Sequence, residues 1–251
     1  MKNKNYISGT FAFKTDLGRT RLSNEDAGAI RVNSEGQVMM VVCDGMGGQN
    51  KGEFASNITV NHFCEEFESV TRFKNLSQIR RWIIKTGKKA NSIVYREGKT
   101  NPMYYGTGTT LTVCVISQNG IIVGQVGDSR CYVLRNRLLT QITEDQTYVS
   151  YLYRTGKITK EEMKTHPKRH MLMNALGIYP SFDIDIQKYT LPKDSILLCS
   201  DGLSNNVSYN EMDAILNNED STEQKVNELI ALANANGGSD NIAICLWEDQ
   251  K

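Results

Sequence analysis

Short apolar runs separated by polar turns occur along most of the chain, and they predict β-strands. The run 38–43 is apolar throughout and ends at Asp44-Gly45, which is typical of a strand buried on both faces with a turn at its carboxyl end. The run 195–199 ends before Asp201-Gly202 in the same way. Further strands are predicted over 111–116, 121–126, 131–134 and 242–247, the first three as an antiparallel meander with an Asn119-Gly120 hairpin.

Apolar residues recur at helical spacing in four segments between these strands. Weaker helical signals, at 149–152 and 160–163, fall in a polar segment of about 145–176 that we interpret as an excursion from the core. The four stronger helices are predicted over 52–70, 79–94, 209–216 and 223–235, the last ending at Gly237-Gly238.

Strands that outnumber helices, with the helices in two pairs, indicate an α+β fold in which two packed sheets are covered on the outside by helices. The chain has 251 residues, enough for a large core, and shows no repeat, no low-complexity linker and only four prolines. We therefore predict that residues 1–251 form a single domain with a small subdomain at about 145–176.

Composition narrows the classes of partner and the compartment. Lysine and arginine total 29 against 28 aspartates and glutamates, so a net charge near +1 gives no reason to expect nucleic acid as a partner. The six cysteines form no C-x-x-C pair and five lie in apolar runs, which favours buried, reduced thiols. No apolar run is long enough to span a bilayer and no signal peptide is recognisable, so a cytoplasmic protein without membrane insertion is predicted.

Candidate chemistry lies in four short acidic clusters, at 24–26, 44–48, 200–202 and 238–241. A single Asp-Gly pair after a strand is also an ordinary turn signal. Carboxylates gathered from several strand ends would instead offer the oxygen ligands that Mg²⁺ and Mn²⁺ prefer, and Gly45 would let a backbone carbonyl approach a cation. The leading hypothesis is a metal-dependent hydrolase.

For other polar residues the sequence allows either a structural or a functional role. Arg21, three residues before the first cluster, could be an ion-pair partner or a planar fork for phosphate oxygens. The sequence 127–130 is typical of a strand-to-strand turn, and 106–110 lacks the ending of a P-loop, which favours a structural role. The three histidines have no zinc-like spacing, although His166 in the polar excursion could approach a substrate.

The order and wording of these motifs resemble the PPM family of metal-dependent protein Ser/Thr phosphatases (type 2C), in its bacterial single-domain form. The resemblance extends from about residue 8 to residue 247. It rests on six motifs in the family order, RLSNED at 21–26, VCDGMGG at 42–48 with Gly52-Glu53, GTT at 108–110, VGDSR at 126–130, LCSDGL at 198–203 and GSDN at 238–241.

The resemblance implies a central antiparallel β-sandwich flanked by pairs of α-helices. It also implies two Mn²⁺ or Mg²⁺ ions at one end of the sandwich. Asp44 would bridge them, the Gly45 carbonyl and Asp26 would serve one, and Asp201 and Asp240 would hold the other. A third, weaker ion would lie near Asp128 and the flap, about residues 145–176.

The activity implied is hydrolysis of phosphoserine and phosphothreonine monoesters by a water that bridges the metals, without a phosphoenzyme. Arg21 would bind the phosphoryl group, and the substrates would be phosphorylated proteins, including a membrane-anchored Ser/Thr kinase and its targets. A monomer is expected.

This chain departs from the family pattern at three positions. Gln49 and Gln146 stand where bacterial members commonly have histidine, and Met46 replaces a histidine that animal relatives offer as a general acid. Leaving-group protonation would then fall to a metal-bound water or His166.

Two other classes of function remain open from the sequence. A two-metal phosphodiesterase or nuclease also collects carboxylates, though this chain has no basic aromatic stripe. A catalytically weak phosphoprotein-binding module of the same fold is the second alternative.

Overall fold

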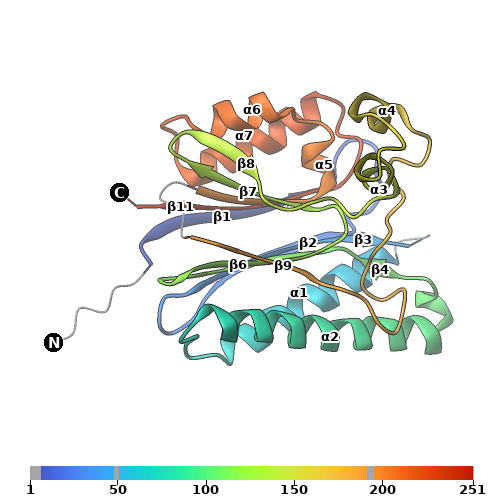
Figure 1. The fold of residues 1–251 in the computed structure, drawn as a ribbon, viewed down its shortest axis with the longest axis horizontal. Coiled ribbons are helices and arrows are strands. Elements are labelled where there is room, and N and C mark those ends of the chain that lie inside the picture. The colour runs from blue at the N-terminus through green and yellow to red at the C-terminus, as the bar shows by residue number, and fades with distance from the viewer. Residues whose placement is uncertain (1–6, 48–50, 191–194, 251) are drawn as a thin grey trace.

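The computed structural model describes residues 7–47, 51–190 and 195–250, in which two antiparallel sheets pack face to face (Figure 1). One sheet has the strand order β1-β11-β10-β7-β8. Its strands are β1 (Gly9–Asp16), β11 (Ile242–Asp249), β10 (Ser195–Cys199), β7 (Arg130–Arg135) and β8 (Leu138–Gln141).

The second sheet has the order β2-β3-β5-β6-β9, with the short β4 paired to β3. Its strands are β2 (Asp26–Val32), β3 (Val38–Met46), β4 (Gly108–Thr109), β5 (Leu111–Ser117), β6 (Gly120–Val126) and β9 (Asp185–Tyr189).

Helices cover the outer face of each sheet (Figure 1). The helices α1 (Gly52–Glu68) and α2 (Leu76–Thr100) lie below the second sheet, and α5 (Asp201–Ser204), α6 (Tyr209–Leu216) and α7 (Thr222–Ala235) lie above the first. Capping boxes at Ser208 and Ser221 start α6 and α7. The segment between β8 and β9 carries α3 (Tyr148–Arg154) and α4 (Lys160–Thr165), and a 3₁₀ turn (Pro102–Tyr104) follows α2.

Three apolar layers fill the space between these elements. Val38, Met40 and Val42 of β3 point into the layer between the sheets, where Trp247 is fully buried. The alternate residues Met39 and Val41 pack on α1 and α2 instead. A third layer joins the first sheet to α5, α6 and α7. The alternation explains why 38–43 is apolar throughout, and the predicted α+β sandwich is confirmed.

Some predicted details were wrong. The strands from 111 to 135 are not one meander, because β5 pairs with β6 but β7 pairs with β10 and β8 in the other sheet. Asp44-Gly45 is not a turn, because β3 continues to Met46. The strands β1 and β2 were not identified individually. No described helix is long and apolar enough to cross a bilayer.

Candidate metal centre

The end of the sandwich at which β3 and β10 finish brings the predicted acidic residues together. Asp26 begins β2 and pairs directly with Asp44 of β3 across the ladder. Asp201 opens α5 after β10, and Asp240 lies just before β11. The segments that pass between the two sheets here, 17–25 and 127–129, carry Arg21 and Asp128.

Burial and mutual repulsion raise the pKa of these carboxyls. Burial raises the pKa of Asp26 to about 8, with an opposing contribution from the Ser200 hydroxyl and a further rise from the Asp201 carboxylate. Burial, then the charges of Asp26 and Asp201, raise the pKa of Asp44 well above its usual range. The pKa of Asp201 is also raised, first by burial and then by Asp240. Each group therefore resists ionisation unless positive charge is supplied.

Asp128 joins this group electrostatically. Its pKa is raised to about 8, first by burial and then by the nearby carboxylates of Asp201 and Asp145, against the lowering effect of Arg130. Arg130 forms a two-point ion pair with Asp145, in which its Nε donates to Oδ1 at 3.0 Å and its Nη2 to Oδ2 at 2.7 Å. The charge of Arg130 is therefore not available to Asp128 alone.

Two buried carboxylate oxygens, Asp26 Oδ2 and Asp201 Oδ1, have no hydrogen-bond partner among the residues that the structure describes. A buried acceptor without a donor is costly, and it is more costly when it carries charge. In the described residues, no three His, Cys, Asp or Glu side chains form a ready-made metal-binding group. Mg²⁺ and Mn²⁺ commonly take one or two carboxylates and fill their other positions with water, so the unpartnered oxygens fit such an ion.

The backbone beside Asp44 is held by close packing of two glycines. A Cβ at Gly45 would collide with the carbonyls of Gly52 and Glu25, and one at Gly52 would collide with the Gly45 backbone. The Gly45 amide donates to the Glu25 carbonyl at 3.1 Å, and the Glu25 carboxylate accepts from the Gly52 amide at 3.1 Å. Glu25 is therefore a positioning residue that the sequence reasoning placed in a motif but did not select.

The GTT motif supports Asp44 directly. The Thr110 hydroxyl accepts from the Asp44 amide at 2.8 Å, and the Thr109 hydroxyl donates to the Asp44 carbonyl at 2.9 Å. The structural role inferred for 106–110 is consistent with these bonds.

Arg21 reaches the cluster through an ion pair. Its Nη2 lies 2.7 Å from Asp240 Oδ2, and half of the Arg21 side chain is exposed. This hydrogen bond is the main cause that raises the pKa of Arg21. The sequence left two roles open for Arg21, an ion-pair partner and a binder of phosphate oxygens. Its position is compatible with both, because the guanidinium is an ion-pair partner here and also lies beside the acidic cluster.

Asn241, which the sequence reasoning did not select, fastens the Arg21 segment to the start of β11. It is buried, and its Oδ1 accepts from the Glu25 amide at 2.8 Å. Its Nδ2 donates to the carbonyls of Leu17 and Ser23. The contacts of Asn241 reach residues more than two hundred positions away, so the sequence gives no local sign of them. The only sequence signal for Asn241 was its position next to Asp240.

The two flap histidines have different surroundings. His166 accepts from the Lys168 amide and packs near the Tyr148 ring, both within the flap. His170, four residues further, lies near enough to Asp201 to oppose the rise in the pKa of that carboxyl. The substrate contact predicted for His166 stays a prediction. Gln49 lies outside the described residues.

Comparison with known proteins identifies the family. The model of the protein phosphatase 2C family matches residues 18–246. The serine/threonine phosphatase Stp of Listeria monocytogenes is 37% identical over 239 residues, which cover 94% of each chain.

Solved structures agree with this match. Serine/threonine phosphatase Stp1 from Staphylococcus aureus superposes with a TM-score of 0.89 at 34% identity, covering 100% of both chains. The catalytic domain of the protein phosphatase PstP, solved with two manganese ions, gives 0.82 at 28% identity and covers 97% of this chain and 99% of that one. The match of sequence and fold over nearly the whole length shows that this chain belongs to the protein phosphatase 2C family.

Proposed function

We propose that this chain is a metal-dependent protein phosphatase that hydrolyses phosphoserine and phosphothreonine monoesters. The observation that carries this proposal is the pair of unpartnered buried carboxylate oxygens, on Asp26 and Asp201, inside a cluster of like charges. Such a cluster is poorly stabilised by the chain alone and is well matched to divalent cations. When bound, two Mn²⁺ or Mg²⁺ ions supply a nucleophilic water and neutralise phosphate charge.

The residues that would hold the ions come from both sheets. Asp44 would be shared between the two, Asp26 and the Gly45 carbonyl would serve one, and Asp201 and Asp240 the other. Asp128 would take part in a third, weaker site. We call these five aspartates, Asp26, Asp44, Asp128, Asp201 and Asp240, the acidic rim. The Thr109, Thr110 and Glu25 bonds keep the rim rigid before a substrate arrives.

Arg21 would orient the phosphoryl group. It is paired with Asp240 in the structure, and a cation held by Asp240 would compete with the guanidinium for that carboxylate. The planar fork of Arg21 would then donate to two phosphoryl oxygens and position phosphorus beside the aspartates.

Further parts of the proposal concern the cell. We propose that residues 1–251 act as one domain and one cytoplasmic monomer, with the flap of about 145–176 over the site. The substrates would be phosphoproteins, among them a membrane-anchored Ser/Thr kinase and its targets. His166 or His170 would contact the substrate or protonate its leaving oxygen.

The test is phosphate release from a phosphothreonine peptide with Mn²⁺, with EDTA, and with Mn²⁺ in the Asp44→Ala variant. A phosphodiester substrate is assayed in parallel. Release from the monoester alone, lost with EDTA and in the variant, would support the proposal. Diester cleavage would favour the nuclease class, and phosphopeptide binding without release would favour the binding module.

A further inference from the structure

Gln146 makes an unusual number of hydrogen bonds for a partly exposed side chain. Its Oε1 accepts from the Gly127 amide at 3.0 Å and from Asn174 Nδ2 at 2.8 Å. Its Nε2 donates to Asp185 Oδ2 at 2.8 Å and to the Gln125 carbonyl at 3.4 Å. One side chain therefore touches β6, the turn after it, the end of the flap and β9.

These bonds close the base of the flap. The backbone carbonyl of Gln146 accepts from the Met173 amide at 2.9 Å, and Thr147 forms an isolated bridge with Leu172. Asn174, the side-chain partner of Gln146, also donates to the Asp183 carbonyl at 2.7 Å. The two segments that lead into and out of the flap are thus joined to each other at this residue.

The same residue holds the turn that carries Asp128. The Gln146 amide donates to the Gly127 carbonyl at 3.0 Å, and the Gly127 amide donates back to the Gln146 side chain. Gly127 has a φ of 95° and lies against Thr110, so this turn has little freedom to adjust. Asp128 follows directly, and its direction depends on the turn.

The bonds also require an amide rather than a carboxylate or an imidazole. The oxygen faces two N–H donors, and the nitrogen faces a carboxylate and a carbonyl. Glutamate would keep the acceptor but would place a negative charge against Asp185. An imidazole has one nitrogen acceptor at most and could not reproduce all four contacts.

We propose that Gln146 is a positioning residue that couples the flap to the Asp128 turn, so that the flap cannot move without disturbing the acidic rim. The coupling itself rests on hydrogen bonds in the described chain. Only its consequence for a cation near Asp128 rests on the proposed function.

The direct test is hydrogen exchange of the Gly127 amide, followed by NMR in EDTA for the wild type, Gln146→Ala and Gln141→Ala. Gln141 is the matched control, because it bonds to Asp145 and the Thr143 carbonyl and has no recorded bond to Gly127 or Asn174. We expect Gly127 to exchange at least about tenfold faster in Gln146→Ala and unchanged in the control. Unchanged exchange in Gln146→Ala would overturn the proposal.

A conservative variant separates the two arms of the side chain. Gln146→Glu retains an acceptor for Gly127, so we expect its exchange to stay within about threefold of the wild type. Flap amides near Met173 and Asn174 should exchange faster, because the Asp185 contact becomes repulsive. If Gln146→Glu loosened Gly127 as much as Gln146→Ala does, the specific coupling would be wrong and a general loosening would replace it.

Calorimetric titration with Mn²⁺ tests the consequence for the metal site. In Gln146→Ala we expect the weakest binding step to lose about tenfold in affinity while the tighter steps change by less than about twofold. Equal weakening of all steps would contradict a role confined to the Asp128 turn. If the wild type bound no Mn²⁺, the proposed function would fail, whereas the exchange experiment in EDTA would still decide whether Gln146 couples the flap to the turn.

Discussion

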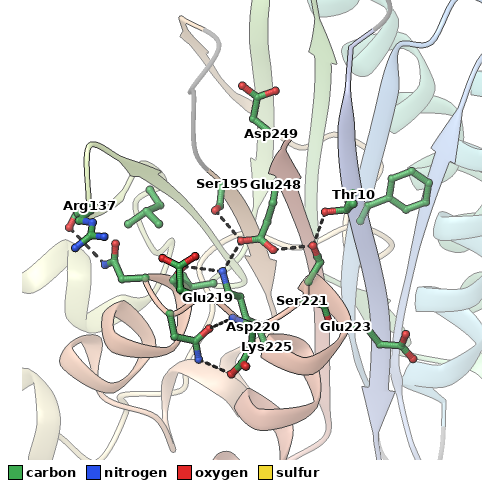
Figure 2. Close-up of a pocket in the computed structure, with 16 residues that line it drawn as sticks. Thr10, Arg137, Ser195, Glu219, Asp220, Ser221, Glu223, Lys225, Glu248 and Asp249 are labelled. Atoms are coloured by element: carbon green, nitrogen blue, oxygen red, sulfur yellow. Dashed lines mark hydrogen bonds and ion pairs between the residues drawn. The ribbon is translucent and has the colours of Figure 1, made fainter. Parts of the chain in front are cut away.

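The two ends of the sandwich both hold carboxylates away from bulk solvent, fully or in part, but surround them in opposite ways. At the end described above, Asp26 and Asp201 keep oxygens without partners and their carboxyls repel one another. At the far end, Glu248 of β11 lies beside a cavity of about 570 Å³ and is surrounded by donors (Figure 2). At the Glu248 end the chain supplies hydrogen-bond donors to its own carboxylate. At the other end it leaves carboxylate oxygens open to a ligand.

The Glu248 end is complete without any ligand. Lys225 Nζ lies 2.8 Å from Glu248 Oε1 and also donates to the Leu216 carbonyl. Thr222 donates to Glu248 Oε2 at 2.6 Å and Ser195 to Oε1 at 3.3 Å. Figure 2 draws the Ser195 side chain beside the Glu248 carboxylate. A buried charge with this many partners contributes to folding, whereas an unpartnered one marks a site that a ligand must complete.

Removing the Lys225–Glu248 ion pair should have the largest effect of the changes considered, and this effect should be on stability alone. Lys225→Met leaves the partly buried Glu248 without its cation, and we expect a loss of about 3 kcal/mol in the free energy of unfolding. Urea unfolding measures it, and kcat of the folded fraction should be unchanged. The double variant Lys225→Met/Glu248→Leu should recover most of the loss; if it did not, packing rather than charge would explain the effect.

Removing a carboxylate from the unsatisfied end should have the opposite pattern. For Asp201→Ala we expect a fall in kcat of at least about 10²-fold, because electrostatic stabilisation of this kind is usually worth that much. In EDTA the melting temperature of this variant should rise above that of the wild type, because one repelling charge has been removed. Near-normal turnover would refute the assignment of Asp201.

The metal-free protein should lose stability as pH rises. The pKa values of Asp26 and Asp128 are raised from 3.8 to about 8. Between about pH 4 and pH 8 the folded state therefore binds more protons than the unfolded state, so its stability is greatest below this window and falls through it.

Thermal melts in EDTA at several pH values, with Asp26→Asn as the control that should flatten the slope, measure this effect. Mn²⁺ at about 100 times its Kd should add about 2.7 kcal/mol at pH 8. A pH slope of opposite sign would contradict the burial of ionisable carboxyls at this end.

The smallest effect is expected at the rim. Arg21→Lys keeps the charge but loses the planar fork, and we expect about a tenfold loss in kcat/KM, which corresponds to about 1.4 kcal/mol. Arg19→Lys, a neighbouring arginine without a recorded contact to Asp240, is the matched control. Equal losses in both variants would point to general charge attraction instead of an oriented contact.

Sequence patterns located much of the architecture because each strand and helix carries its own periodicity. The buried strand 38–43 and helix 209–216 could be read locally, and Asp44 and Asp201 followed because they stand where apolar runs end. The change of sheet between β6 and β7 could not be read, since the turn at 127–129 has the composition of a hairpin and the choice depends on pairing with β10.

Positioning residues were the harder part to predict. Asn241, Glu25 and Gln146 act through backbone groups that are distant in sequence, and an amide or carboxylate gives no local sign of such partners. The place of His170 relative to Asp201 depends on how the flap is folded, which no spacing along the chain determines. Family resemblance supplied the acidic positions but left these supports unidentified.

The six cysteines are all free and buried, as the sequence predicted, and burial raises the pKa of every one, to about 12 for Cys199. Peroxide and alkylating reagents act on exposed thiolates, which these side chains do not provide. Phosphatase activity should therefore persist at peroxide concentrations that inactivate enzymes with an accessible nucleophilic thiol.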